Sequence, residues 1–338
     1  MSEHTYDVAV VGGGAAGLSA ALVLGRARRR VAVIDAGAPR NTPAAHMQGY
    51  LSRDGMAPAE FLAAGRDEVA RYGVELIDDQ VLGIDTGFAV RLAGGRTLTA
   101  RRVLMATGVG DELPDVPGVR QRWGKDLLHC PYCHGWEVRD QPLGVLGALP
   151  GSAQHALLVR QWSDDVVFFV HTSDLTPIER RQLEARGIRV VAGEVAKLVV
   201  ENDRLIGVEM ADGRFVPRAA VFVRPGNLPH DDGLLAGLGC ALSEAGFPLV
   251  DATGRTSVAG VWAAGNVSDP RAQVITSAGA GSAAAIAINA DLVQEDVERA
   301  LGGMDGDGRA FSATNEAGVT DVILGDRRHG LELSKSQP

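Results

Sequence analysis

The sequence is poor in cysteine, in aromatic residues and in long apolar runs. Its 338 residues include three cysteines, and aromatic residues make up 5% of the chain. Three cysteines are too few for a disulfide-stapled scaffold. No stretch reaches the roughly 18 consecutive apolar residues of a membrane-spanning helix. The nearest approach, residues 278–290, is rich in Gly and Ala and is interrupted by Ser282 and Asn289.

An excess of positive charge is also missing. The formal net charge is -9, which argues against a nucleic-acid-binding protein because phosphate binding depends on Lys and Arg. Residues 1–7 are polar and slightly acidic, so they lack the basic start of a secretory signal. We therefore expect a cytoplasmic protein that binds neither nucleic acid nor a membrane.

Glycine, by contrast, is abundant, with 43 residues, and the first cluster has a specific spacing. A buried strand is predicted over residues 6–11, and a helix up to about residue 28. Between them lies Gly12-x-Gly14-x-x-Gly17. Gly12 permits a tight turn, Gly14 lets the backbone approach a pyrophosphate, and Gly17 lets helix and strand pack closely. The turn therefore predicts a dinucleotide site that includes Ala15 and Ala16.

Further residues favour FAD as the dinucleotide. Asp35 ends the second predicted strand, where a carboxylate can accept hydrogen bonds from the ribose hydroxyls. Two later segments follow strands that would end at the same crevice, namely Ala106-Thr107-Gly108 and Gly265-Asn266. Gln273 and Val274 lead into a small-residue helix, predicted over residues 277–292, whose N-terminus would stabilise negative charge on a reduced flavin.

A second strand–turn–helix–strand unit begins at residue 143, between proline-containing joints at 113–118 and 245–248. The predicted fold class is therefore α/β, with two Rossmann-like, doubly wound, three-layer nucleotide-binding domains, the second inserted into the first. We assign residues 1–118 and 245–302 to the FAD-binding domain. Residues 119–244 form an NAD(P)H-binding-like domain, and residues 303–338 an irregular C-terminal tail. Short strands within 75–105 are predicted to be antiparallel.

The most informative stretch is His129-Cys130-Pro-Tyr-Cys133-His134. The C-x-x-C spacing brings two sulfurs within reach of a disulfide, and thiolate attack on such a disulfide exchanges it. His129 and His134 are candidates for proton acceptor and donor. A c-type haem attachment, half of a zinc site and a glutaredoxin-like centre are alternatives. The first requires export, the second lacks clustered ligands, and the third belongs to a far shorter fold. Cys240 is expected to be a buried structural thiol.

These motifs together resemble those of the thioredoxin reductase-like flavoproteins over about residues 5–300. The resemblance rests on Gly12–Gly17, Ala106–Gly108, Cys130–Cys133, residues 260–266 and residues 273–279. It implies bound FAD, a homodimer, and a division of labour in which Cys133 faces the flavin and Cys130 meets the substrate. Two departures are His134 and Asn266, each at a position where thioredoxin reductases carry Asp.

A third departure concerns the second glycine turn, Gly147-Ala-Leu149-Pro-Gly151. In the GxGxxG register Leu149 falls where the backbone should approach a pyrophosphate, and its side chain would obstruct that approach. No Arg pair follows the next strand, because Arg180 and Arg181 come later, on an expected helix surface. These features count against NADPH binding, although a variant turn that still binds NADPH stays open.

The combination of Cys-x-x-Cys-His with an altered second turn is similar to the dithiol oxidases of the gliotoxin and holomycin pathways. The favoured function is therefore oxidation of a small-molecule dithiol to a disulfide through Cys130, Cys133 and FAD, with oxygen as acceptor. An NADPH-dependent reductase of a thioredoxin-like disulfide is the alternative enzyme. A redox sensor that never turns over is a third possibility.

Overall fold

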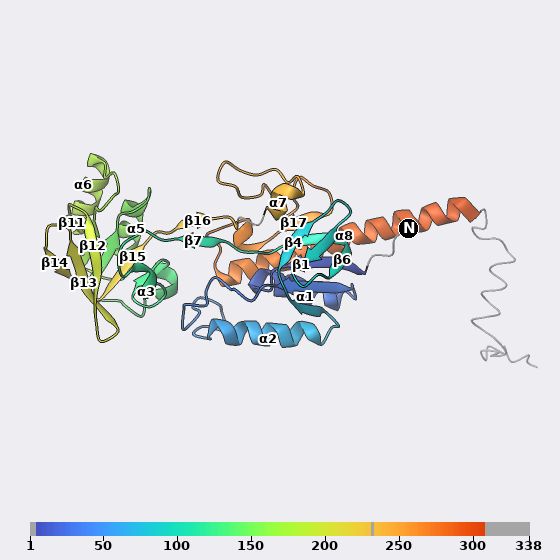
Figure 1. Ribbon diagram of the computed structural model, residues 1–338, viewed down its shortest axis with the longest axis horizontal. Coiled ribbons are helices and arrows are strands. Elements are labelled where there is room, and N and C mark those ends of the chain that lie inside the picture. The colour runs from blue at the N-terminus through green and yellow to red at the C-terminus, as the bar shows by residue number, and fades with distance from the viewer. Residues whose placement is uncertain (1–4, 231–232, 308–338) are drawn as a thin grey trace, which may run out of the picture. The chain divides into compact units, whose positions relative to one another are not determined.

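Residues 5–230 and 233–307 are described by the computed structural model shown in Figure 1. The chain divides into two compact parts after Ile288. Both nucleotide-type sheets belong to the first part.

The first sheet has seven strands in the order β3-β2-β1-β6-β5-β4, with β17 also paired to β6 (Figure 1). The strands are β1 (Tyr6–Val11), β2 (Val31–Asp35), β3 (Glu75–Asp78), β4 (Val81–Ile84), β5 (Ala89–Leu92), β6 (Thr97–Met105) and β17 (Val261–Ala263). Strands β3, β2, β1, β6 and β17 are parallel, whereas β4, β5 and the start of β6 form an antiparallel meander.

The antiparallel prediction for residues 75–105 is therefore wrong for β3. This strand follows helix α2 (Pro58–Ala70), which carries the chain back across the sheet after β2. A strand reached through such a crossover runs parallel to its neighbour. Helix α1 (Ala15–Arg26) forms the earlier crossover, between β1 and β2, and packs against α2.

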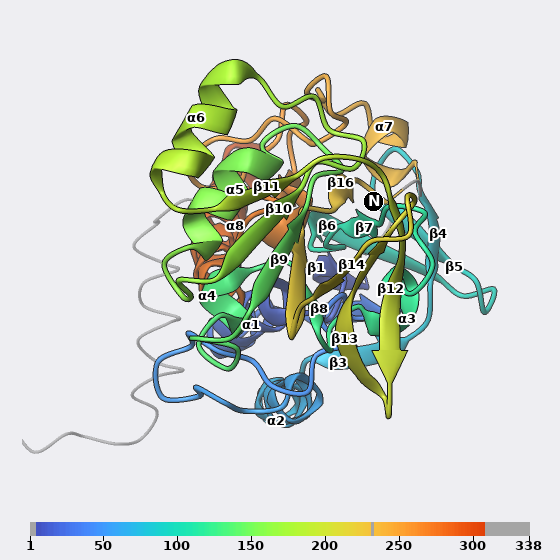
Figure 2. The same cartoon turned by 90° about the vertical axis from the view of Figure 1, so that its left-hand side faces the viewer.

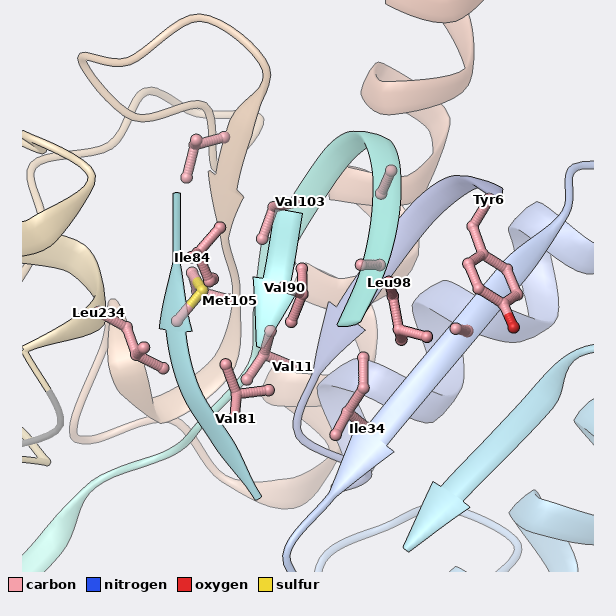
Figure 3. Close-up of a cluster of buried hydrophobic side chains, with 14 of the residues drawn as sticks. Tyr6, Val11, Ile34, Val81, Ile84, Val90, Leu98, Val103, Met105 and Leu234 are labelled. Atoms are coloured by element: carbon pink, nitrogen blue, oxygen red, sulfur yellow. The ribbon is translucent and has the colours of Figure 1, made fainter. Parts of the chain in front are cut away.

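A cluster of buried apolar side chains fills one face of this sheet (Figure 3). It combines strand residues such as Ile84 and Met105 with Leu234, from the short helix α7 (Leu234–Gly237), and with Cys240. The proline joint at 245–248 predicts that Leu234 and Cys240 belong to the second domain. Their packing places them in the core of the first sheet instead.

Two short strands connect the sheets. They are β7 (Gly110–Glu112) and β16 (Gly226–Leu228), which pair antiparallel with each other. The whole second sheet lies between them in the chain, and β17 then returns to the first sheet. This order confirms the predicted insertion of one nucleotide-type domain into the other.

The second sheet is parallel, with five strands in the order β11-β10-β9-β15-β8. These are β8 (Leu127–Leu128), β9 (Leu143–Leu146), β10 (Val166–Phe169), β11 (Arg189–Val191) and β15 (Ala220–Val223). Helices α5 (Ser152–Val159) and α6 (Pro177–Ala185) cover one face, and the three-stranded sheet of β12 (Val195–Glu201), β13 (Arg204–Met210) and β14 (Phe215–Pro217) covers the other (Figure 2). Phe168 points to the helices and Phe169 to β12–β14, so alternation along a buried strand builds three layers.

Three short helical segments complete this architecture: α3 (Val119–Arg122), α4 (Pro131–His134) and the 3-10 turn η1 (Gly265–Val267). The last element is the long helix α8 (Val274–Asp307). We predicted a helix over 277–292 and irregular chain from residue 302, but the helix continues through Asp307. Contacts one turn apart extend it, with Gln294 donating to Glu298 and Arg299 paired with Glu295. The rest of the predicted tail, residues 308–338, lies outside the described residues. Among the helices of the described ranges, none combines the length and apolarity needed to cross a membrane.

Candidate active site

Cys130 and Cys133 are joined in a disulfide at the start of α4, with their Cα atoms 5.2 Å apart. Cys130 has an extended backbone and precedes the helix, and Pro131 occupies its first position, where a missing N–H costs nothing. The N–H groups of Cys133 and His134 both donate to the carbonyl of Cys130, each at 3.1 Å. The tight turn therefore fixes the distance between the two sulfurs.

The two flanking histidines are half-buried, and burial is the main cause of their altered basicity. Burial, assisted by the nearby guanidinium of Arg40, lowers the pKa of His129 to about 4. Burial also lowers the pKa of His134, although the carboxylate of Glu137 opposes that shift. Both rings are neutral at neutral pH, so both can accept a proton. His129, with the pKa near 4, is the weaker base.

A third histidine, His155 on α5, contacts this centre, although no motif in the sequence predicts it. Its Nε2–H donates to the main-chain carbonyl of His129 at 2.9 Å, and the two imidazole rings lie 6.0 Å apart. Burial lowers the pKa of His155 to about 4 as well. The sequence shows only that His155 lies near the start of a helix that follows a glycine turn. That pattern does not predict a contact with a residue 26 positions away.

Two large aromatic side chains next to the disulfide are exposed. Tyr132 is 63% exposed and Trp136 is 66% exposed. Neither is loose, because Tyr132 packs edge-on against Trp162 at 5.4 Å and the guanidinium of Arg139 lies 4.0 Å from the centre of the Trp136 ring. The disulfide is thus bordered by apolar surface that the fold holds in place but leaves open to solvent.

The first glycine turn has the shape that the pyrophosphate of a dinucleotide requires. Gly12 has φ of 108°, and a methyl group there would collide with the backbone of Ala106. A methyl group on Gly17 would collide with the carbonyl of Gly12. Around Gly14, by contrast, nothing lies within 4 Å of the position that a Cβ would take. The turn is packed tightly on the protein side and open on the side of the helix N-terminus, as pyrophosphate binding needs.

The other predicted cofactor residues partly converge on this turn. Thr107 and Gly108 follow Ala106 at the carboxyl end of β6, and Gly265 starts η1 at the end of β17. Methyl groups on Gly265 and Gly281 would both collide with Ala16, so α1, η1 and α8 meet there. These residues fit an extended dinucleotide such as FAD.

Asp35, Asn266, Gln273 and Val274 have their own contacts in the structure. The Asp35 carboxylate is 3.4 Å from Arg66 Nη1. The Asn266 amide donates to the carbonyls of Asp269 and Ala272, so it stabilises the loop before α8. Gln273 precedes α8, with its Oε1 3.6 Å from the position of a Cβ on Gly49, and Val274 is the first residue of that helix.

Cys240 lies outside this centre. It is buried, its thiol is 3.6 Å from the hydroxyl of Thr256, and burial raises its pKa. A buried thiol with a raised pKa is a poor nucleophile at neutral pH. The expectation of a buried thiol at this position is confirmed.

A model of the pyridine nucleotide-disulphide oxidoreductase family matches residues 6–284. The chain belongs to this family. Thioredoxin reductase sirT of Leptosphaeria maculans is 32% identical to it over 317 residues, which cover 86% of this chain and 96% of that one. Among solved structures, one called HlmI is 59% identical with a TM-score of 0.86, covering 88% of this chain and 96% of the other. An oxidoreductase from Agrobacterium tumefaciens is 35% identical with a TM-score of 0.80, covering 85% and 98%.

These comparisons confirm the resemblance drawn from the motifs. The chain is a thioredoxin reductase-like pyridine nucleotide-disulphide oxidoreductase, an enzyme that acts on sulfur groups. Its fold of two Rossmann-like domains is the fold of its structural neighbours.

In this pyridine nucleotide-disulphide oxidoreductase the second glycine turn is closed on itself. The N–H of Gly147 donates to the carbonyl of Phe169, as the N–H of Gly12 does to the carbonyl of Ile34 in the first turn, so this bond does not distinguish the two turns. The N–H of Leu149 donates to the Ser152 hydroxyl at 3.4 Å, and the N–H of Ser152 donates back to the Leu149 carbonyl at 3.2 Å. The N–H of Leu149, at the position where the backbone should approach a pyrophosphate, is therefore directed at Ser152 within the turn.

The residues after the next strand do not supply a basic pair. His171, with φ of 48°, accepts a hydrogen bond from the N–H of Val195 at 3.1 Å, which ties the end of β10 to β12. Arg180 and Arg181 are exposed on α6, as predicted. The guanidinium of Arg224 lies beside the turn, since a methyl group on Gly151 would collide with it.

Proposed function

We propose that this enzyme oxidises a small-molecule dithiol to a disulfide through Cys130 and Cys133, with bound FAD and with oxygen as the final acceptor. One dithiol and one O2 would yield one disulfide and one H2O2. The observation that carries the proposal is the closed turn at Leu149, which argues against a nicotinamide donor and makes the substrate the source of electrons.

FAD would be held by the first glycine turn and the residues that converge on it. These are Gly12, Gly14, Ala15, Ala16, Gly17, Ala106, Thr107, Gly108 and Gly265, with Asp35, Asn266, Gln273 and Val274 completing the site. When bound, FAD supplies an acceptor for the two electrons of the reduced cysteine pair. The open space at Gly14 and the tight packing at Gly12 and Gly17 support this assignment.

The cysteine pair would carry out two exchange steps. A substrate thiolate attacks Sγ of Cys130, which forms a mixed disulfide and breaks the Cys130–Cys133 bond, so that Cys133 leaves as a thiolate. The second substrate thiolate then attacks the substrate sulfur of the mixed disulfide. That step closes the product disulfide and releases Cys130 as a thiolate. His134 accepts the proton of the attacking thiol, because it is neutral at neutral pH and is a stronger base than His129.

The surface beside the disulfide supports an apolar substrate. Tyr132 and Trp136 together expose aromatic area within three residues of Cys133, and an exposed aromatic patch of this kind is a typical contact surface for an apolar ligand. A compact apolar scaffold that carries two thiols would cover this area during the exchange.

NADPH-dependent reduction of a thioredoxin-like disulfide is the second candidate. Arg224 favours it, because its exposed guanidinium lies beside Gly151, the residue before α5, where it could pair with a phosphate. The name of the relative sirT points the same way.

Oxygen uptake by the FAD-loaded protein distinguishes the two candidates. With dithiothreitol as substrate we expect oxygen consumption that does not depend on NADPH, and no consumption by the Cys130→Ser variant. In anaerobic stopped flow, dithiothreitol should bleach the flavin absorbance quickly and NADPH should not. Rapid bleaching by NADPH, together with NADPH-dependent reduction of a thioredoxin-like protein, would establish the reductase instead.

The proposal includes a homodimer. Val293, Val297 and Leu301 are exposed on α8 at four-residue spacing, so they share one face of the helix. A second copy of the chain would cover this apolar stripe. Light scattering should give twice the mass of 35.4 kDa. A monomeric mass for the wild type would remove the dimer from the proposal.

A further inference from the structure

The peptide units on both sides of Cys130 are anchored. On one side, the Cys130 carbonyl accepts the N–H groups of Cys133 and His134. On the other side, the carbonyl of His129 accepts the Nε2–H of His155 at 2.9 Å. The first pair of bonds belongs to the turn of the C-x-x-C motif itself, whereas the His155 bond comes from a different element, α5.

The His129 carbonyl needs such a partner because the sheet ends just before it. Strand β8 pairs with β15 at Leu127 and Leu128, opposite Val221 and Phe222, and the pairing stops there. Beyond the last pair of this ladder, His155 supplies the hydrogen bond to the His129 carbonyl. Its ring packs edge-on against Phe222 with the ring centroids 6.1 Å apart, and this packing fixes the position of the Nε2–H donor.

The contact also fixes the chemical state of His155. A carbonyl can only accept, so Nε2 must carry the hydrogen and Nδ1 must be bare. Nδ1 is buried, and it has no hydrogen-bond partner within the part of the chain that the structure describes. Adding a proton to Nδ1 would create a buried, unpaired cation. The ring therefore stays neutral and serves as a permanent donor rather than as a proton carrier.

We infer that His155 is a positioning residue for Cys130, which it holds in place through the carbonyl of His129. The inference rests on the proposed exchange at Cys130. When the disulfide opens, Cys130 loses its covalent link to Cys133, and the anchor from α5 keeps the two sulfurs at bonding distance. The reduced pair is then preorganised to close again, and the oxidised pair presents Cys130 to the substrate in one position.

Paired variants test this role. His155→Gln keeps an N–H donor at a similar reach, whereas His155→Leu removes the donor but keeps an apolar side chain of similar size. Gln154→Leu is the matched control, because Gln154 is exposed on the same helix and contacts only Glu179 among the hydrogen bonds of the described residues.

The first measurement is the thiol–disulfide equilibrium of the Cys130–Cys133 pair in glutathione buffers, read by maleimide trapping and mass spectrometry. In this exchange one glutathione disulfide oxidises the cysteine pair and yields two glutathione thiols. Loss of the donor should lower the equilibrium constant for disulfide formation roughly fivefold, as expected for one lost hydrogen bond. His155→Gln and Gln154→Leu should stay within about twofold of the wild type.

The second measurement is turnover of dithiothreitol by the FAD-loaded protein. His155→Leu should lower kcat by roughly 5- to 30-fold with little change in KM, and His155→Gln should restore most of it. If His155→Leu and His155→Gln behave alike in both assays, the positioning role is wrong. If the wild type does not oxidise dithiothreitol at all, the proposed function fails, and the glutathione equilibrium still decides the role of His155.

Discussion

Gly17 lies so close to Gly12 that a methyl group on Gly17 would collide with the carbonyl oxygen of Gly12. A methyl group on Gly14, which lies between them in the sequence, would meet nothing within 4 Å. The two glycines of one motif are therefore required for different reasons. One keeps helix α1 in contact with β1, and the other leaves room for a ligand.

This difference predicts opposite results for two alanine substitutions. Gly17→Ala should destabilise the fold by about 1–3 kcal/mol, the usual cost of overpacking a tight contact. Gly14→Ala should leave the melting temperature of the FAD-free protein unchanged but prevent copurification of FAD. Thermal unfolding and the flavin absorbance of the purified proteins report the two effects. A Gly14→Ala protein that retains FAD would show that the pyrophosphate does not lie there.

The cysteines give a second prediction. Cys130→Ser and Cys133→Ser should each abolish dithiol oxidation while FAD stays bound, because neither cysteine contributes to the glycine turn that would hold the cofactor. Cys240→Ser is the matched control, since Cys240 is buried beside Thr256 and away from the disulfide. It should keep turnover within about twofold, and its cost, on the order of 1 kcal/mol, should appear only in stability. Oxygen uptake together with flavin content measures both, and loss of turnover in Cys240→Ser would implicate a third thiol.

The sequence predicted those parts of the fold that depend on local signals. The turn at Gly12 and the turn at Cys130 each have spacing that only a few backbone conformations satisfy, and the structure has both. The insertion of the second domain followed from two strand–turn–helix units separated by proline joints. The two turns are each set by residues that are close in the chain, and the insertion follows from the order of the two units along it.

The features that the sequence did not predict depend on contacts between distant residues. Strand β3 is parallel because of the crossover through α2, which its own residues do not encode. Leu234 packs on the first sheet although it precedes the proline joint. The sequence around His155 has no distinctive pattern, and its hydrogen bond to the His129 carbonyl depends on the end of β8 lying beside α5. Periodicity cannot report such packing, because it records only neighbours along the chain.

The acid–base role proposed for His134 predicts a pH dependence. The base must be neutral to accept a proton, and burial lowers its pKa below the ordinary value of 6.5. The acidic decline in activity, caused by protonation of His134, should therefore have its midpoint below pH 6.5. His134→Gln should lose this acidic limb and reduce kcat/KM by a factor on the order of 100 or more. A pH profile of dithiothreitol oxidation measures the limb, with the exposed His230→Gln as control. An unchanged limb in His134→Gln would assign the proton transfer to another group.

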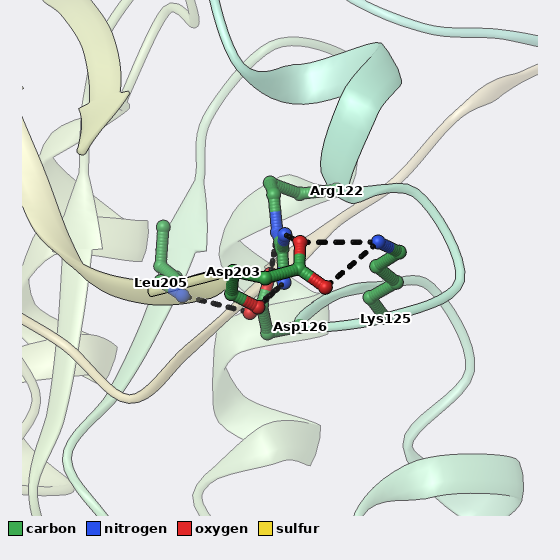
Figure 4. Close-up of polar contacts among 5 residues, drawn as sticks. All are labelled: Arg122, Lys125, Asp126, Asp203 and Leu205. Atoms are coloured by element: carbon green, nitrogen blue, oxygen red, sulfur yellow. Dashed lines mark hydrogen bonds and ion pairs between the residues drawn. The ribbon is translucent and has the colours of Figure 1, made fainter. Parts of the chain in front are cut away.

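The last prediction concerns Arg122, which connects three segments of the second domain (Figure 4). Its buried guanidinium donates to the Asp126 carboxylate at 2.6 and 2.7 Å and to the main-chain carbonyl of Asp203 at 2.8 Å, and it also pairs with the Asp203 carboxylate. Asp126 in turn accepts the N–H of Leu205 at 2.8 Å. Arg122 thereby ties the segment that leads into β8, and hence to the disulfide, to the turn between β12 and β13.

Removing this guanidinium should leave the Asp126 carboxylate, which is 17% exposed, without its main partner. Arg122→Met should therefore lower the free energy of unfolding by about 3 kcal/mol. Lys125→Met is the matched control, because Lys125 pairs with the same Asp203 but both partners are at least half exposed. Surface pairs of that kind contribute about 0–1 kcal/mol. Denaturant unfolding of the two variants measures the difference. Equal losses would mean that the network is no more than a surface ion pair, and that the segment before Cys130 is held by its apolar packing alone.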